Sequence, residues 1–166
     1  MHDYTIGVEF GYINREVRDR DVRVHIWDTA GQEVFQSITR SYYQKTAIVF
    51  LVYDITNRYS FYHLPRWVDE IRKNAGREVM VVVVGNKRDK GGDRQIPESS
   101  GREFAEGHGF LFIETSSRTR NDMDLLDFVL PILMDKIESG VPCDGVRVGT
   151  VQVPSPPSNN TCCKIL

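Results

Sequence analysis

The chain lacks the features that mark disulfide-stapled, membrane-spanning and nucleic-acid-binding proteins. It has three cysteines in 166 residues, two of them adjacent near the end, so we expect no disulfide framework and a reducing, cytosolic compartment. No apolar run approaches the roughly 18 residues of a transmembrane helix, and the first residues show no signal-peptide pattern. Because the formal net charge is only −2, bulk electrostatics gives no reason to expect a nucleic acid as partner.

The residues that are present fit one soluble globular domain followed by a tail. Hydrophobic residues make up 40% of the chain and charged residues 27%, which are ordinary values for a globular protein. After Ser139 the composition shifts to proline, asparagine and serine. We therefore expect a folded domain over residues 1–139 and a flexible tail over residues 140–166.

Strand patterns alternate with helix patterns along the domain. The first two predicted strands, from Val8 to Ile13 and from Val22 to Trp27, form an antiparallel hairpin around a charged, solvated turn, Arg15 to Asp21. Three more strands are predicted over 47–53, 79–84 and 111–113, and helices within 37–43, from about 60 to 75, over 97–106 and over 125–137. Glycines 76 and 107 are expected to end two of these helices, and Pro131 to kink the last one or delay its start.

This alternation predicts a doubly wound α/β fold. The run from Val79 to Val84 is continuously apolar and β-branched, which is typical of a strand buried on both faces of a parallel sheet. In such folds ligands bind outside the carboxyl ends of the strands. The segments that follow the strands are therefore the places to look for chemistry.

One such segment is Trp27-Asp28-Thr29-Ala30-Gly31-Gln32-Glu33. An aspartate at the end of a buried strand can place a carboxylate near a magnesium ion, and a following glycine leaves its N–H free to approach a phosphate. The D-x-x-G part alone is a weak signal, because Asp and Gly are common after strands.

A stronger signal is Gly85-Asn86-Lys87-Arg88-Asp89, directly after the strand over 79–84. The Asp89 carboxylate can accept hydrogen bonds from the N1–H and the exocyclic amine of guanine, a donor pair that adenine lacks. The stem of Lys87 can lie along the base, and Asn86 can tie neighbouring loops together. A single match of this kind also fits an ordinary polar exit from a strand.

The next strand ends in Glu114-Thr115-Ser116-Ser117-Arg118, and this second motif strengthens the guanine interpretation. Together the motifs resemble the Rab-type small GTPases of the Ras superfamily, whose corresponding element reads E-T-S-A-K. Further Rab-like segments are Ile6–Phe10, Ser37–Thr39, Tyr42-Tyr43 and Leu51–Thr56, so the resemblance runs from Thr5 to about Ile137.

The resemblance implies a P-loop NTPase-like (Ras-type), doubly wound and mostly parallel sheet, and a switch in vesicle traffic that binds and hydrolyses GTP with Mg2+. In that interpretation Thr5 coordinates the ion, Asp28 reaches it through water, Gly31 contacts the γ-phosphate and Gln32 orients the attacking water. Asn86, Lys87, Asp89, Ser116, Ser117 and Arg118 form the base site. Phe10, Trp27 and Tyr42 form a surface for effectors, unless they are ordinary core residues. Exchange factors and GTPase-activating proteins are the other expected partners.

The sequence departs from that family in one respect. No G-x-x-x-x-G-K-[ST] motif occurs, and the chain has no Gly-Lys pair. In the family this loop grips the phosphates and follows a strand that lies between those ending at Asp28 and Asp54. We therefore expect an N-terminally incomplete fold with unpaired inner sheet edges, and weak or no binding of GTP by the chain as written.

Three hypotheses follow. The chain is a Rab GTPase recorded without its N-terminal portion, or Met1 is a true start and the product is a nucleotide-poor interaction module, or the product does not fold and has no activity.

The final residues, Cys162-Cys163-Lys164-Ile165-Leu166, fit a prenylation motif. Lys164 is a poor match to an aliphatic position, but the adjacent cysteines resemble the Rab pattern in which both thiols are lipidated, and two lipids anchor a protein far better than one. This predicts attachment to the cytoplasmic face of endomembranes or the plasma membrane, and a cytosolic pool when the protein is extracted. The alternative is two free cysteines in a flexible tail.

Overall fold

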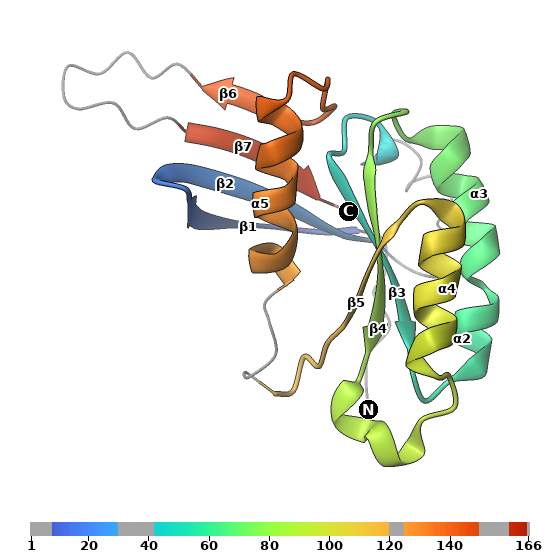
Figure 1. Cartoon of the computed structure of the whole chain (residues 1–166). Helices are drawn as coiled ribbons and strands as arrows, with labels where there is room; N and C mark the ends of the chain where they lie inside the picture. The colour runs from blue at the N-terminus through green and yellow to red at the C-terminus, as the bar shows by residue number, and fades with distance from the viewer. Residues whose placement is uncertain (1–7, 30–41, 120–124, 150–159, 166) are drawn as a thin grey trace. The chain divides into compact units, whose positions relative to one another are not determined.

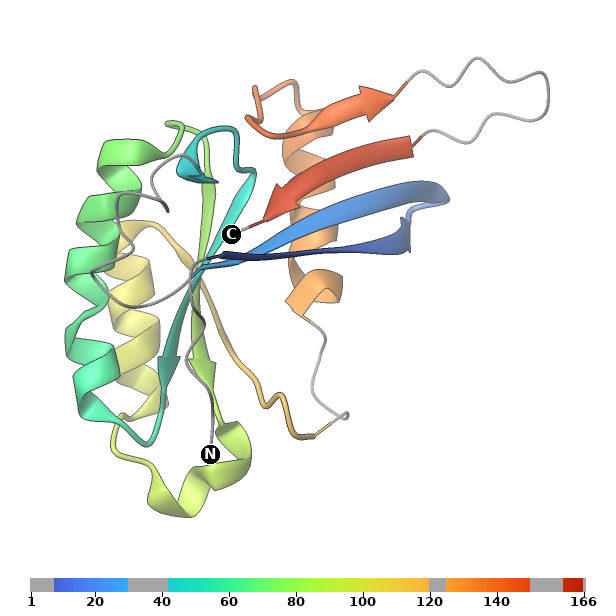
Figure 2. The ribbon, with the colours of Figure 1, turned by 180° about the vertical axis from the view of Figure 1, so that it is seen from behind.

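The computed structural model describes residues 8–29, 42–119, 125–149 and 160–165. Figures 1 and 2 show the ribbon from opposite sides. The chain divides into two compact units. The first comprises Met1–Ile48, Asn74–Val79 and Met134–Leu166, and the second comprises Val49–Lys73 and Met80–Leu133. The first unit thus contains both ends of the chain.

The second unit is built on three neighbouring strands, β3 (Ile48–Asp54), β4 (Met80–Asn86) and β5 (Leu111–Glu114). Strands β4 and β5 pair in parallel from Val82↔Leu111 to Gly85↔Glu114, and β3 runs in the same direction as β4 (Figure 1). Every residue of β4 before Asn86 is buried, as its continuous apolar run predicts. The parallel sheet expected from the sequence is thus confirmed.

Helices α2 (Arg58–Tyr62), α3 (Leu64–Asn74) and α4 (Glu98–His108) lie on one side of this sheet in both views. The α3 residues Leu64, Val68 and Ile71 are buried, and their spacing of about one turn places them on one apolar face. Such a stripe is what packs a helix against a sheet.

Helix α4 ends two residues later than the sequence predicts. Gly107 lies inside the helix, and Gly109 ends it with a left-handed φ of 73°. The Gly109 N–H reaches the carbonyls of Ala105 and Glu106, which satisfies acceptors that the last turn leaves open. The sequence offered two glycines, and the one that adopts positive φ terminates the helix.

The first unit opens with a long hairpin of β1 (Val8–Val17) and β2 (Arg20–Thr29), paired from Val8↔Thr29 to Val17↔Arg20. The turn consists of Arg18 and Asp19 alone, which have φ angles of 53° and 58°. The predicted seven-residue turn from Arg15 to Asp21 was therefore too long. Two residues of positive φ match the twist of the flanking strands, so pairing continues through the charged residues.

The hairpin tip is held by the end of α5 (Leu125–Glu138) rather than only solvated. Arg18 Nη1 lies 2.6 Å from Asp135 Oδ1 and 3.3 Å from Glu138 Oε2, and Arg20 Nη1 lies 3.3 Å from Glu138 Oε1. Helix α5 begins at Leu125, as predicted, and continues through Pro131.

The described residues of the C-terminal segment include two strands. Strands β6 (Arg147–Gly149) and β7 (Asn160–Ile165) pair antiparallel, and β7 pairs in parallel with β2 from Val22↔Thr161 to Ile26↔Ile165. The inner edge of β2, which the sequence led us to expect unpaired, is thus covered by the end of the chain. An open edge presents unpaired N–H and C=O groups, and pairing them with β7 satisfies those groups.

Candidate guanine-binding site

In the second unit, the segments that follow β3, β4 and β5 are joined by backbone hydrogen bonds. The Ile55 N–H donates to the Asn86 carbonyl at 3.1 Å, which joins the first segment to the second. The second and third are joined twice, by Arg88 N–H to the Thr115 carbonyl at 3.1 Å and by Thr115 N–H to the Gly85 carbonyl at 2.9 Å. These bonds fix three loops at the carboxyl edge of a parallel sheet, which is where such folds bind ligands.

The carboxylate of Asp89 is held between two of these loops. The buried hydroxyl of Ser116, which follows β5, donates to Asp89 Oδ1 at 2.6 Å. The same hydroxyl oxygen accepts from the N–H groups of Arg118 and Thr119, at 3.2 and 3.3 Å. Ser116 thus organises its own loop and fixes the orientation of Asp89.

This arrangement leaves the Asp89 carboxylate able to bind a base. An ionised carboxylate has about four acceptor positions, and the Ser116 hydroxyl uses one of them. Asp89 itself is exposed, so a ligand can reach it. A fixed, accessible carboxylate is the group needed to accept the two adjacent N–H donors of guanine.

Asn86 and Lys87 precede the short 3-10 helix η2 (Arg88–Asp93), which carries Asp89. The Lys87 N–H donates to Asn86 Oδ1 at 2.7 Å, and the Lys87 carbonyl accepts from Lys90 N–H at 2.8 Å. Lys87 has left-handed backbone angles, φ 67° and ψ 36°, which are unfavourable for a residue with a Cβ. Several contacts on both sides of the residue hold it in that conformation.

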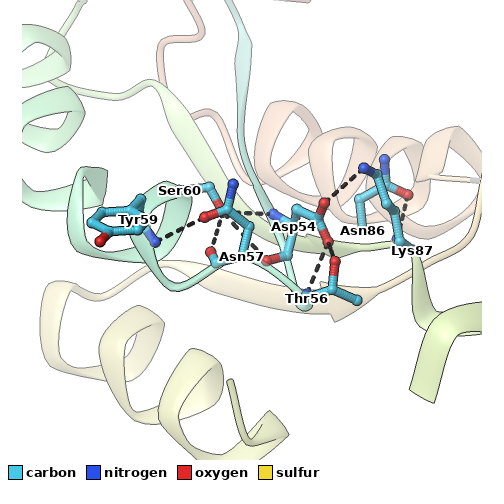
Figure 3. Close-up of polar contacts among 7 residues, drawn as sticks. All are labelled: Asp54, Thr56, Asn57, Tyr59, Ser60, Asn86 and Lys87. Carbon is cyan, nitrogen blue, oxygen red and sulfur yellow. Dashed lines mark hydrogen bonds and ion pairs between the residues drawn. The ribbon is translucent and has the colours of Figure 1, made fainter. Parts of the chain in front are cut away.

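The side chain of Lys87 forms an ion pair with Asp54, the last residue of β3 (Figure 3). Lys87 Nζ lies 2.7 Å from Asp54 Oδ2, while Asp54 Oδ1 accepts from the N–H and the hydroxyl of Thr56, at 2.8 and 2.7 Å. Burial raises the pKa of Asp54, but the hydrogen bonds from Lys87 and Thr56 outweigh it, so the pKa lies below its ordinary value.

The backbone around Asp54 is fixed by the start of α2. The Asp54 N–H donates to Ser60 Oγ at 3.0 Å, and the Ser60 hydroxyl lies 2.7 Å from the Asn57 carbonyl that accepts its proton. Asn57 in turn caps α2, with its Oδ1 accepting from Tyr59 N–H at 3.0 Å. The strand end and the helix start therefore form one hydrogen-bonded turn, which the Asp54 side chain joins to Lys87 (Figure 3).

A second ion pair supports the loop after β5 from below. Arg94 Nη1 and Nη2 donate to Glu114 Oε1 and Oε2, at 2.6 and 2.7 Å, and the Glu114 side chain is only 5% exposed. Neither Arg94 nor Asp54 was identified as a site residue from the sequence. The sequence does contain a signal for Asp54, because this residue follows a predicted strand as Asp28 does. It contains none for Arg94.

The structure places the predicted base-site residues in the second unit, at the ends of two adjacent strands. The residues concerned are Asn86, Lys87, Asp89, Ser116, Ser117 and Arg118. Ser117 and Arg118 are exposed. The Arg118 N–H donates to Ser116 Oγ.

The residues predicted to act on the phosphates are only partly described. Asp28 lies exposed near the end of β2, in the first unit. Thr5, Gly31 and Gln32 lie outside the described residues. Within the described ranges, no group of three or more His, Cys, Asp or Glu side chains is arranged to hold a metal ion.

The three aromatic residues expected to form an effector surface contact one another in the first unit. The ring centroids of Phe10 and Trp27 lie 4.6 Å apart, and those of Trp27 and Tyr42 lie 4.8 Å apart. Phe10 is 53% exposed, so it is not an ordinary core residue. Its neighbour on the same strand, Tyr12, is more exposed still.

The two cysteines of the expected lipidation motif lie on β7. Cys162 pairs through its backbone with Arg23 and Arg147, and Cys163 pairs with Val24. Over the described part of the chain, no helix combines the length and the apolar character that crossing a bilayer requires.

A comparison with known protein families bears on all of these observations. The model of the Ras family matches residues 1–130, well over half of the chain. The match, together with a three-stranded parallel sheet flanked by helices, confirms the expected P-loop NTPase-like α/β fold. The chain therefore belongs to the Ras family of small GTPases.

Proposed function

We propose that this chain is a Rab-type small GTPase whose second unit recognises the guanine base of GTP and GDP. The observation that carries the proposal is the carboxylate of Asp89, fixed by Ser116 across two loops and accessible to a ligand. Guanine offers two adjacent donors to such a group and adenine does not, so the site selects between the two purines. A base that lacks this donor pair gains neither of the two hydrogen bonds to the carboxylate, and this loss is the basis for discrimination.

The proposal includes weak binding of the phosphates of the nucleotide. The sequence holds no G-x-x-x-x-G-K-[ST] motif, whose backbone N–H groups and lysine bind the phosphates in P-loop proteins. We therefore expect residues 1–166 to bind guanosine 5′-monophosphate, GDP and GTP with similar, low affinity. By resemblance to the family, the proposal also includes GTP hydrolysis with Mg2+. The residues that would act in this step, in the roles that the resemblance implies, are Thr5, Asp28, Gly31 and Gln32.

A change of base specificity tests the proposal directly. In Asp89→Asn the amide presents one acceptor and one donor, which complement the N1–H and the C2 carbonyl of xanthine. NMR titration of isotopically labelled protein with the monophosphates of guanosine, xanthosine and adenosine measures the three affinities. The wild type should prefer guanosine and Asp89→Asn should prefer xanthosine, while Asp69→Asn, an exposed acid on α3, should behave as wild type. Equal weak binding of all three monophosphates by the wild type would refute guanine recognition.

The Rab assignment rests on the tryptophan-containing segment from Trp27 and on the aromatic cluster of Phe10, Trp27 and Tyr42. In this proposal the cluster binds effectors that control vesicle traffic. The exposed Phe10 ring supplies apolar area of the kind that protein interfaces use.

The same cluster supports a second candidate function, that of an interaction module with little nucleotide binding. The two candidates are separated by nucleotide dependence. If added guanosine nucleotides change the amount of partner captured, the chain acts as a switch. If nucleotides have no effect and Phe10→Ala abolishes capture, the chain acts as an interaction module.

We further propose that Cys162 and Cys163 are prenylated and attach the chain to the cytoplasmic face of a membrane. Pairing of β7 with β2 and lipidation of β7 are alternative states in this proposal, because an enzyme that modifies the chain end needs it in an extended, separate form. Membrane fractionation of the wild type and of a Cys162→Ser/Cys163→Ser double variant tests the attachment. A double variant that remains in the membrane fraction would refute it.

A further inference from the structure

Asp54 is a charged side chain near the proposed base site whose position is fixed by several contacts. Its Oδ1 is held by two hydrogen bonds from Thr56, its N–H by Ser60, and its side chain is only 19% exposed. Oδ2 is directed at Lys87 Nζ, 2.7 Å away (Figure 3). The carboxylate thus has a defined position before any ligand is present.

The side chain of Lys87, unlike that of Asp54, is flexible. The Lys87 backbone is held in a left-handed conformation, but the side chain is 43% exposed and has four rotatable bonds. Without a partner, a long side chain of this kind loses conformational entropy whenever a ligand orders it. An ion pair formed in advance with Asp54 removes that loss.

Asp54 is the last residue of β3, whereas Lys87 directly follows β4 and lies two positions before Asp89. From these contacts we propose that Asp54 is a positioning residue of the base site, which acts by anchoring the Lys87 ammonium so that the Lys87 stem is ordered beside the base. This inference rests on the proposed function and deepens it, because it adds a residue from a third strand to the site.

Two substitutions break the ion pair from opposite ends. Asp54→Asn removes the charge but keeps an acceptor oxygen for Thr56, so the turn that Asp54 caps is retained. Lys87→Met removes the ammonium but keeps an unbranched side chain of similar length. Asp69→Asn on α3 is the matched control for loss of one negative charge. All variants are made in the full chain, residues 1–166.

The measurement is the dissociation constant for guanosine 5′-monophosphate, from the NMR shifts of the Gly85 and Thr115 amides. Because the pair is partly exposed, Asp54→Asn and Lys87→Met should each weaken binding by about two- to fivefold. The double variant should be no weaker than the weaker single variant, since each change removes the same interaction. A merely structural role for Asp54 predicts instead that the two losses multiply.

The outcomes separate this inference from the function on which it rests. If the wild type prefers guanosine over adenosine monophosphate but Asp54→Asn binds guanosine equally well, the positioning role is overturned and the proposed function stands. Losses that multiply in the double variant also overturn it. If the wild type itself shows no preference for guanosine, the proposed function fails, and the inference fails with it.

Discussion

Substitution of Gly101 by alanine should destabilise the protein, although alanine is the better helix former. Gly101 lies within α4, where it is buried. A Cβ added there would overlap the Tyr53 hydroxyl oxygen and two ring carbons of Phe112. The absence of a side chain at Gly101 is what allows α4 to lie this close to Tyr53 of β3 and Phe112 of β5.

The expected magnitude follows from two opposing effects. Alanine in place of glycine within a helix usually gains about 1 kcal/mol. Inserting a methyl group into a filled space usually costs about 1–3 kcal/mol, and here the neighbours are aromatic rings, which cannot rotate away as a flexible side chain does. The cost less the gain leads us to expect that Gly101→Ala lowers the free energy of unfolding by up to about 2 kcal/mol.

Gly107 provides the matched control in the same helix. A Cβ at Gly107 would meet no other atom within 4 Å. Gly107→Ala should therefore raise the free energy of unfolding by about 0.5–1 kcal/mol. Urea unfolding followed by circular dichroism measures both changes as shifts of the midpoint at constant slope.

The result that would refute the reasoning is a Gly101→Ala variant at least as stable as the wild type. Such a result would mean that α4 can move away from the sheet without loss. A Tyr53→Phe substitution in the Gly101→Ala background gives a further check, because removing the hydroxyl should recover part of the lost stability.

Three further predictions concern the same sheet and the chain end. Burial raises the pKa of Tyr53 to about 12 from 10.0, so the folded state keeps a proton that the unfolded chain loses; stability should fall between pH 10 and 12, and Tyr53→Phe should abolish that fall in unfolding titrations. Arg94→Ala should cost about 3 kcal/mol in urea unfolding by leaving the buried Glu114 carboxylate unpaired, whereas Arg102→Ala, which removes an exposed pair, should cost less than about 1 kcal/mol. Deleting residues 160–166 should speed hydrogen exchange at the β2 amides that pair with β7, and unchanged exchange would show that this pairing does not form in solution.

Much of the architecture followed from the sequence, because it depends on local patterns. A continuous β-branched run such as Val79–Val84 is stable only when both faces are covered, which fixes β4 as a central strand. Polar residues after such strands must lie at one edge of the sheet, so Asp89 and Ser116 were expected to be neighbours. The structure confirms the strands and places these two side chains in contact.

The predictions were wrong where two local structures were equally compatible with the sequence. The charged segment from Arg15 to Asp21 has no apolar pattern, so its length as a turn was undetermined until Arg18 and Asp19 were seen at positive φ. The extension of both strands to the tip is supported by Asp135 and Glu138 of α5, more than a hundred residues away in the chain. No window of sequence contains that information.

The sequence by itself indicated where the functional residues follow the strands: Asp28 near the end of β2, the N-K-x-D motif at the end of β4 and the E-T-S motif at the end of β5. Those assignments depend on residue type and spacing, which are local properties. Only the tertiary structure decided that Asp54 anchors Lys87, that Arg94 neutralises Glu114, and that Asn160–Ile165 pairs with β2. Each of these is a pairing between distant segments, and it forms because a buried charge or an open strand edge is stable only when a partner from elsewhere in the chain satisfies it.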